Sequence, residues 1–234
     1  MDFNKHVNQA ASKAYKNESK LSDDVLNMVG MSGNMGRHFL NNLIYDGCNY
    51  LEVGTHVGST LCSALYQNTP NKTFSIDNFA QFGLHDELSP QLYGNIEKFL
   101  PQINGHVHID HDCYDIDFAK YNIKNIDIYM FDGPHSEKNH YDAIIDYFPV
   151  LSNTSIILID DWNGIEARNG THNALKQLYK DKKIESPDTI TLPEYLSDKI
   201  EEFPQGGHAE LNYGEDRLGW HNGFGVFIVK KIVE

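Results

Sequence analysis

After Gly47 the sequence alternates short apolar, β-branched segments with helical ones over most of its length, and this alternation constrains the fold more than any other feature. The predicted strands are Asn49–Val53, Thr73–Asp77, His106–Asp110, Ile126–Phe131 and Ser155–Ile159. The helices predicted between and after them are Ser59–Tyr66, Ser89–Leu100, Glu137–Leu151 and Gly170–Lys182. Apolar strands joined by crossover helices indicate a parallel sheet with helices on both faces. Sheets of this kind bind ligands at the carboxyl ends of their strands.

The segments on either side of this alternation are less regular. Residues 1–20 are polar, and we expect a frayed or weakly docked tail. The stretch from Ser22 to Ile44 predicts two short helices joined by a glycine-bearing turn, so residues 1–47 form a tail and helical cap before a domain over residues 48–234. At the other end, Phe224–Val229 predicts a strand of a final hairpin, whereas residues 183–218 are expected to be loops and short helices. We expect one domain overall.

The charge balance is strongly acidic. Asp and Glu number 33 against 19 Lys and Arg, which gives a formal net charge of −14. Nucleic-acid binding depends on clustered cations, so this balance argues against a nucleic-acid partner. The sequence has neither an apolar run of membrane-spanning length nor a signal-peptide pattern, and its three cysteines lack metal-type spacing. We therefore expect a reduced, cytoplasmic protein with no membrane partner; homo-oligomer formation stays open.

A glycine turn follows the first predicted strand. The chain runs Glu52-Val-Gly-Thr-His-Val-Gly-Ser59, in which Gly54 permits a sharp turn and Gly58 lets a ligand approach the backbone. The G-x-x-x-G spacing differs from the dinucleotide fingerprint, and a P-loop would need a lysine after Gly58. The second strand ends at Asp77, where folds of this class meet a ribose. The alternative is a tight turn followed by a solvated aspartate.

Two later strands also end in carboxylates. Asp132 follows one strand, and Asp160 and Asp161 follow another. Neighbouring parallel strands bring these ends to one edge, where crowded carboxylates repel unless a cation or a proton lies among them. Oxygen ligands without cysteine favour Mg²⁺, with Mn²⁺ or Ca²⁺ as alternatives. Helix capping or exposure to solvent would also explain these acids.

With these motifs the chain resembles the class I S-adenosylmethionine-dependent methyltransferases, whose pattern is an acid, G-x-x-x-G and a serine or threonine, then an acid after the second strand. The resemblance implies an α/β fold: a Rossmann-like, doubly wound sheet of seven strands with the last strand antiparallel and helices on both faces. It also implies S-adenosylmethionine as cofactor, with Asp112 and Cys113 on the adenine side. The implied cofactor-binding residues are Met31, Glu52, Gly54, Thr55, His56, Gly58, Ser59, Asp77, Asn78, Asp112, Cys113 and Asp132.

The segment Asp132-Gly-Pro-His135, followed by the Asp160-Asp161 pair, is similar to the metal-dependent O-methyltransferases of natural-product sugars and of the catechol type. This similarity implies methyl transfer to a hydroxyl group of a small-molecule acceptor, with a divalent cation held by Asp132, Asp160 and Asp161. We predict His135 as the catalytic base, because a histidine accepts a proton near neutral pH. Asp132 is the alternative base, and His135 would otherwise cap the following helix.

The acceptor is the least defined part of the prediction. Trp162, Trp220, His221 and Asn222 are candidates for a wall of the acceptor pocket. Two other functions fit the same motifs: a metal-independent methyltransferase and a non-catalytic S-adenosylmethionine-binding protein.

Overall fold

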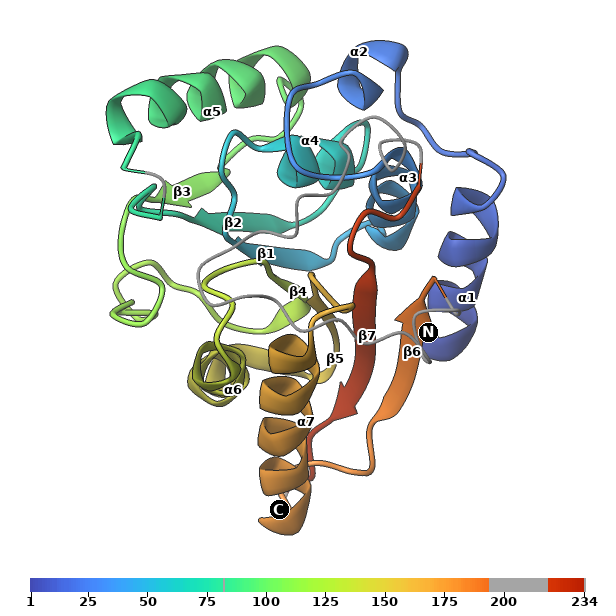
Figure 1. The fold of residues 1–234 in the computed structure, drawn as a ribbon. Helices are drawn as coiled ribbons and strands as arrows, with labels where there is room; N and C mark the ends of the chain where they lie inside the picture. Colours follow the sequence, from blue (N-terminus) through green and yellow to red (C-terminus); the bar gives the residue numbers. More distant parts are fainter. Residues whose placement is uncertain (82, 194–218, 234) are drawn as a thin grey trace.

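A seven-stranded sheet runs through the centre of the protein in the computed structural model, which describes residues 1–81, 83–193 and 219–233 (Figure 1). The strand order is β3-β2-β1-β4-β5-β7-β6. Strands β1 to β5 pair in parallel, whereas β7 is antiparallel to both of its neighbours. The strands are β1 (Asn49–Val53), β2 (Lys72–Ile76), β3 (Val107–Ile109), β4 (Ile126–Phe131), β5 (Leu151–Ile159), β6 (Asp188–Leu192) and β7 (Phe224–Lys230). The predicted Rossmann-like, doubly wound sheet with an antiparallel last strand is confirmed.

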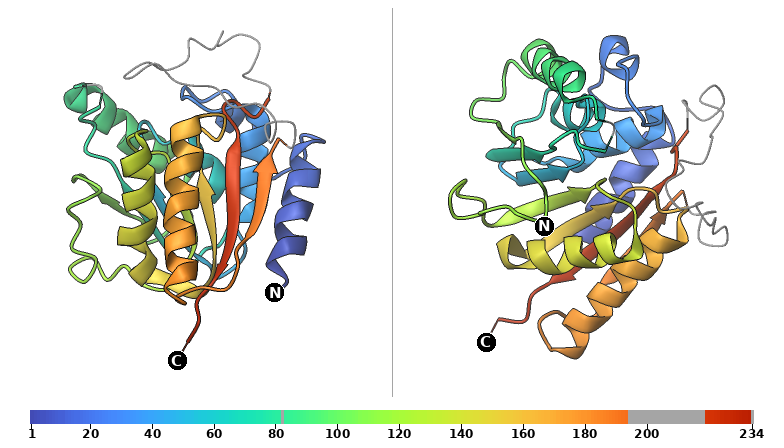
Figure 2. Two further views of the ribbon diagram at one scale, coloured as in Figure 1. Left: turned by 60° about the horizontal axis from the view of Figure 1, so that its bottom comes forward. Right: turned by 60° about the vertical axis from the view of Figure 1, so that its left-hand side comes forward.

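Helices cover both faces of the sheet (Figure 2). One face is covered by α1 (Phe3–Ala14), α3 (Asn34–Leu43), α4 (Ser59–Leu65) and α5 (His85–Phe99), and the other by α6 (Glu137–Tyr147) and α7 (Ile165–Lys180). The short helix α2 (Asp23–Leu26) precedes α3, and a 3-10 turn, η1 (Phe148–Val150), precedes β5. Successive β4 residues alternate between the two cores: Ile128 and Met130 join the first, Tyr129 and Phe131 the second. Burial on both faces explains the uninterrupted apolar strands.

The N-terminal segment is a docked helix over Phe3–Ala14, so of the two expectations, a frayed or a weakly docked tail, the frayed tail is wrong. Its small apolar residues Val7, Ala10 and Ala14 are at most 2% exposed and recur at helical spacing. The side chain of Asp2 caps the helix by accepting a hydrogen bond from the Lys5 amide, 3.1 Å away. Most residues of this segment are polar, so its average polarity did not indicate the narrow apolar stripe along one side of the helix. The predicted pair of short helices after Ser22 is confirmed as α2 and α3.

The C-terminal prediction needs two corrections. Strand β6 lies within residues 183–218, where we expected loops and short helices; residues 194–218 of that range lie outside the described part of the chain. Strand β7 pairs with β6 rather than forming a hairpin across the turn before Phe224. Two helices also begin earlier than predicted. Helix α5 begins at His85, so Pro90 lies inside the helix and not in its first turn. Helix α7 begins at Ile165 instead of Gly170.

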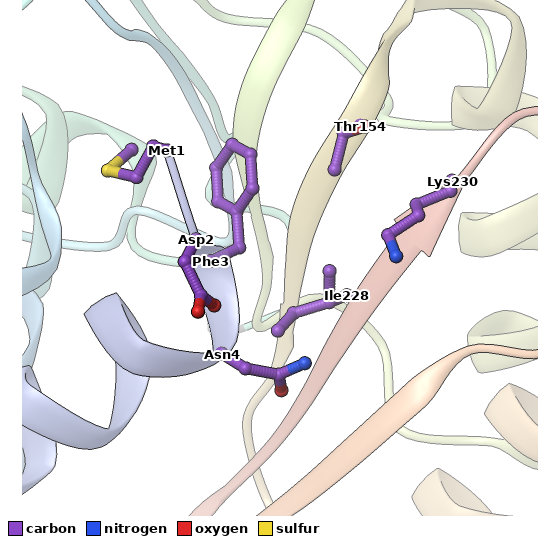
Figure 3. Close-up of a pocket in the computed structure, with 7 residues that line it drawn as sticks. All are labelled: Met1, Asp2, Phe3, Asn4, Thr154, Ile228 and Lys230. Carbon is purple, nitrogen blue, oxygen red and sulfur yellow. The ribbon is translucent and has the colours of Figure 1, made fainter.

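A cavity of about 290 Å³ lies between the start of α1 and strands β5 and β7 (Figure 3). Residues 1–4, Thr154, Ile228 and Lys230 line it. Thr154, which pairs with Lys230, lies in the first half of β5. The cavity is therefore remote from the carboxyl ends of the strands, where a sheet of this class binds ligands. None of the helices in the described part of the chain is long and apolar enough to span a membrane.

Candidate functional site

The carboxyl ends of the central strands bring the predicted residues to one edge. Backbone hydrogen bonds continue the parallel pairing one residue past the strands: the Gly54 amide donates to Ile76, the Asp132 amide to Val53 and the Asp160 amide to Phe131, at 2.9, 2.9 and 3.0 Å. The glycine turn and the two acidic strand ends are therefore aligned as rigid continuations of the sheet. This is the convergence that the strand pattern predicted.

The two turn glycines are required for different reasons. Gly54 has φ +84°, and a Cβ atom built there would lie 1.7 Å from the carbonyl oxygen of Asp132, so only glycine fits. Gly58 has φ +85°, and its Cβ would lie 2.7 Å from Cδ1 of Leu92 on α5. The side of Gly58 on which a Cβ would lie is therefore filled by α5, and its predicted contact with a ligand stays a prediction. Thr55, between them, is 1% exposed.

Glu52 lies beneath the turn and is fully buried. Its Oε2 accepts a hydrogen bond from the Tyr50 hydroxyl at 2.6 Å, and its Oε1 accepts one from Thr60 Oγ1 at 2.8 Å. Burial raises the pKa of Glu52 to about 7, although both hydrogen bonds favour the charged form. Through these contacts Glu52 connects β1 to α4, and its predicted contact with a cofactor stays a prediction.

Asp77 joins the glycine turn to the end of β2. Its Oδ2 accepts from the His56 amide at 2.6 Å, and its Oδ1 accepts from the Phe79 amide at 2.7 Å. His56 has φ +49°, a left-handed conformation that these contacts stabilise. Each carboxylate oxygen has a second lone pair, so Asp77 can still accept from a ligand hydroxyl. Asn78 is occupied locally, since its Oδ1 accepts from the Ala80 amide at 3.0 Å.

The two adenine-side candidates follow β3. Asp112 is exposed, and its Oδ1 accepts from the Tyr114 amide at 2.9 Å. Cys113 is half-buried, and its carbonyl oxygen accepts from the Tyr147 hydroxyl at 2.8 Å. These contacts fix the loop after β3. They leave the adenine role of both residues a prediction.

The segment between α2 and α3 reaches the first residue of α4. Ser32 Oγ lies 3.2 Å from Ser59 Oγ, and a Cβ built at Gly30 would lie 2.2 Å from the same Ser59 oxygen. Met31 lies between these two contacts and is half-buried. The structure therefore brings together Met31 and Ser59, two of the predicted cofactor residues that are distant in the sequence.

The acidic strand ends form a compact cluster with one histidine. Nε2 of His135 lies 3.0 Å from Oδ2 of Asp161 and 3.9 Å from Oδ1 of Asp132. One ligand atom from each of these three side chains falls within 4.8 Å of the others. Asp161 has φ +53°, and its Oδ1 accepts a hydrogen bond from the side-chain amide of Asn222.

Asp160 is not part of this group, which corrects the predicted set of metal ligands. Its side chain is 6% exposed, and its charge helps to raise the pKa of Asp132. Both aspartates follow the end of β5, and Asp161, with φ +53°, is the one whose carboxylate contacts His135. Among the described residues, His135 takes the third position that we had assigned to Asp160.

The cluster has strongly perturbed protonation equilibria. Burial raises the pKa of Asp132 well above its ordinary value, and the charges of Asp160 and Asp161 raise it further. Burial also raises the pKa of Asp161, but hydrogen bonds from His135 and Asn222 outweigh it and lower the pKa to about 2. Burial lowers the pKa of His135, whereas Asp161 raises it, and the net shift is upward. His135 and Asp161 thus form an ion pair in this structure.

Some neighbours of the cluster lie in other surroundings than the sequence predicted, and one contact made by the turn that carries Asn222 was not predicted. Trp162 and Trp220 are 1% and 4% exposed, so they belong to the core rather than to a pocket wall. Asn222 was expected to face the acceptor, but its side chain binds Asp161. Its turn also reaches the other part of the site, because the carbonyl oxygen of Gly219 accepts from the Met35 amide at 3.0 Å. Spacing along the chain gives no signal for such contacts.

Residues 51–162 match a protein family described as a methyltransferase domain. This segment runs from β1 through Asp132 and His135 to the residue after Asp161, and so contains both the glycine turn and the acidic cluster. The matched segment spans just under half of the 234-residue chain, and over it the chain is similar to that methyltransferase domain. No curated protein matches the chain.

Solved structures share the fold of this protein at low identity. An O-methyltransferase from Bacillus cereus in complex with SAH has a TM-score of 0.56 at 13% identity, covering 98% of this chain and 91% of that one. A proposed rRNA methylase from Clostridium thermocellum has a TM-score of 0.54 at 13% identity, covering 88% and 99%. A proposed RNA methyltransferase from Pyrococcus horikoshii has a TM-score of 0.52 at 13% identity, covering 97% and 98%. Because the printed descriptions of these proteins differ in acceptor, the shared fold does not identify an acceptor for this chain.

Proposed function

We propose that this protein transfers the methyl group of S-adenosylmethionine to a hydroxyl oxygen of a small molecule, assisted by a divalent cation. The observation that carries the proposal is the cluster of Asp132, His135 and Asp161 beside the glycine turn. The turn and the cluster are in direct contact, since the Gly54 backbone packs against the carbonyl group of Asp132. A methyl donor at the turn would therefore lie beside a group that holds a hydroxyl.

The donor set fits a divalent cation. Two carboxylates and one imidazole offer three ligand atoms within 4.8 Å of one another, and the carboxylates would lose their mutual repulsion. Carboxylate oxygens suit Mg²⁺ or Ca²⁺, whereas the imidazole shifts the preference towards Mn²⁺. When bound, the cation would act as a Lewis acid that lowers the pKa of an acceptor hydroxyl. Asp160 lies outside this set of ligand atoms and would act on Asp132 through its charge.

The protein residues then have distinct tasks. Asp77 would accept hydrogen bonds from the ribose, as its free lone pairs allow. Where Asp132 and Asp161 alone hold the cation, His135 would remove the proton of the acceptor hydroxyl, because its Nε2 then keeps its lone pair. The imidazole must first lose its own proton. Its pKa is raised by Asp161, so a positive charge that neutralises Asp161 would lower that pKa towards neutrality. Asp132 is the alternative base, because it too has a raised pKa.

The acceptor is best sought among small polyhydroxylated molecules. A net charge of −14 opposes the phosphate backbone of RNA, even though proposed RNA methyltransferases share the fold. Methyl transfer is an in-line displacement whose rate depends mainly on alignment of the two reacting atoms. Adjacent hydroxyl groups on a sugar or a phenol would allow two-point attachment to the cation and so fix that alignment.

The first test is a transfer assay with vicinal diols, using purified protein with Mg²⁺, Mn²⁺ or excess EDTA. We expect methylation with cation and its loss in EDTA, while SAH binding by calorimetry persists in both. Full activity in EDTA would favour the metal-independent enzyme. SAH binding without product from any acceptor would favour the non-catalytic protein, and failure to bind SAH would refute the proposal as a whole.

The second test uses matched variants. Asp161→Asn removes a carboxylate from the cluster, whereas Asp117→Asn makes the same change at an exposed position outside it. Only the first should weaken Mn²⁺ binding measured by electron paramagnetic resonance. Equal Mn²⁺ affinity in both variants would argue against the cation site while leaving cofactor binding intact.

A further inference from the structure

The turn that leads from β5 into α7 is fixed beside the acidic cluster by main-chain pairing. The backbone amides of Trp162 and Asn163 donate to the carbonyl oxygens of Gly223 and Asn222, at 3.3 and 3.1 Å. These bonds extend the antiparallel contact of β5 with β7 beyond the end of β5 and the start of β7. Asn163 is 6% exposed, so its side chain is enclosed at this position.

Two side-chain amides in series connect the cluster to this turn. Nδ2 of Asn222 donates to Oδ1 of Asp161, and Nδ2 of Asn163 donates to Oδ1 of Asn222 at 3.3 Å. A carboxylate can only accept, so Asp161 fixes the orientation of the first amide, and the first amide fixes that of the second. The far end of the series is therefore an oxygen, Oδ1 of Asn163. Across two amide groups it lies no more than about 10 Å from Oδ1 of Asp161, a separation that one small molecule can bridge.

This oxygen is one of two buried acceptors at the start of α7 that lack a donor. Oδ1 of Asn163 and Oε2 of Glu166 are both buried, and neither has a hydrogen-bond partner in the described part of the chain. Glu166 belongs to the first turn of α7, three residues after Asn163. Buried polar atoms in native proteins nearly always have a partner. Two unpaired acceptors in one short segment therefore indicate a donor that is supplied by a ligand.

A primary amine suits these two oxygens better than a hydroxyl group does. An ammonium group has three donors and no lone pair, so it can bond both oxygens and leaves no acceptor of its own unpaired, whereas a hydroxyl group donates only once. The carboxylate of Glu166 also attracts a positive charge. The cationic side chain of the same segment, Arg168, is directed towards Trp162, since its Nε donates to the Trp162 carbonyl oxygen at 2.5 Å.

We propose that the acceptor molecule carries a primary amine in addition to its reacting hydroxyl group, and that Asn163 and Glu166 bind this amine. The inference rests on the proposed function, which places the hydroxyl group at the cluster of Asp132, His135 and Asp161. It adds a substrate class, because amino alcohols and amino sugars are preferred to plain polyols and phenols. The acceptor is then held at two separate points, one at each end of the amide series.

The test uses pairs of probes that differ only in an amine or a hydroxyl group at one position: 3-amino-1,2-propanediol with glycerol, and glucosamine with glucose. Their binding to the protein with SAH and Mn²⁺ is measured by calorimetry at neutral pH. The amino member of a pair should bind roughly 10-fold more tightly or better, the usual effect of a hydrogen bond to a charged group. If no amino member binds more tightly than its hydroxyl counterpart, the amine site is overturned, and a water molecule is sufficient to pair the two oxygens.

Glu166→Gln separates the carboxylate from any other source of the preference. The variant keeps an oxygen at this position but removes the charge, so the preference for the amino member should fall roughly 10-fold while binding of the hydroxyl member stays the same. Glu137→Gln is the matched control, because it makes the same change at an exposed position in the first turn of α6. An equal preference in the two variants would contradict the assignment of Glu166.

Asn163→Leu tests the other oxygen. It should weaken binding of the amino member more than binding of the hydroxyl member. If Asn163 served only to hold Asn222 in place, both members would weaken equally, together with Mn²⁺ binding measured by electron paramagnetic resonance, and the assignment of Asn163 would be wrong. Should this variant fail to fold, Glu166→Gln still decides.

The outcomes also distinguish this inference from the function on which it rests. Wild-type protein that does not bind SAH refutes both. Wild-type protein that binds SAH and methylates the hydroxyl member of a pair as efficiently as the amino member overturns the amine site and leaves the proposed methyl transfer standing.

Discussion

The buried carboxyl group of Glu52 gives a sharp prediction about pH and stability. Its pKa is raised from 4.5 to about 7 in the folded protein, so the folded state binds a proton more tightly than the unfolded chain. The resulting stabilisation is fully present below pH 4.5 and is lost as the pH rises through 7. A shift of this size corresponds to about 3 kcal/mol in total, of which about 2.5 kcal/mol falls between pH 5 and pH 8.

Glu52→Gln isolates this effect, because glutamine has nearly the same shape and does not titrate. Its amide oxygen can still accept from Tyr50, and its amide nitrogen can donate to Thr60. The free energy of unfolding of the wild type minus that of the variant should fall by about 2.5 kcal/mol from pH 5 to pH 8. Taking this difference cancels other titrations that the two proteins share.

Urea unfolding followed by tryptophan fluorescence measures the difference, since both tryptophans are buried and lose their surroundings on unfolding. Glu97→Gln, an exposed change on α5, controls for the general effect of removing one charge. If the difference for Glu52→Gln varied by less than about 0.5 kcal/mol over this pH range, the pKa of Glu52 would not be raised and the argument would fail.

Three further outcomes follow from the geometry. Gly54→Ala forces a Cβ onto the Asp132 carbonyl oxygen and should lower stability by about 3 kcal/mol, whereas Gly94→Ala, whose Cβ meets nothing within 4 Å, should not; equal melting temperatures would contradict this. His140 is 1% exposed and burial lowers its pKa from 6.5 to about 3, so the free energy of unfolding of the wild type minus that of His140→Leu should fall by about 2 kcal/mol from pH 7 to pH 5; a difference that does not change with pH would refute the cause. Asn222→Ala removes a donor to Asp161 and should weaken Mn²⁺ binding about 10- to 100-fold, as outer contacts of metal ligands commonly do; unchanged affinity would remove Asn222 from the site.

The sequence predicts those elements whose local pattern and tertiary environment agree. Strands β1 and β4 are buried on both faces, and their apolar runs are visible without any structure. Strand β6 was missed because its residues are mostly exposed or half-buried at the edge of the sheet, which leaves no apolar run to detect. Helix α1 was missed because its apolar stripe consists largely of alanine, which scarcely raises the mean hydropathy.

The sequence predicts which acidic residues meet at this edge of the sheet, but not how their side chains are oriented. That Asp132, Asp160 and Asp161 meet at one edge follows from the parallel strands that carry them. Which of the two consecutive aspartates faces His135 depends on the positive φ of Asp161, a backbone detail that sequence spacing does not encode.

The contact between Gly54 and the Asp132 carbonyl oxygen also bears on how such a protein can change over time. A side chain at the turn would push away the strand end that carries the carboxylate, so neither feature can be altered while the other stays fixed. The glycine turn and the acidic cluster therefore have to change together. Diversification towards new acceptors would then have to proceed through segments that do not touch this contact.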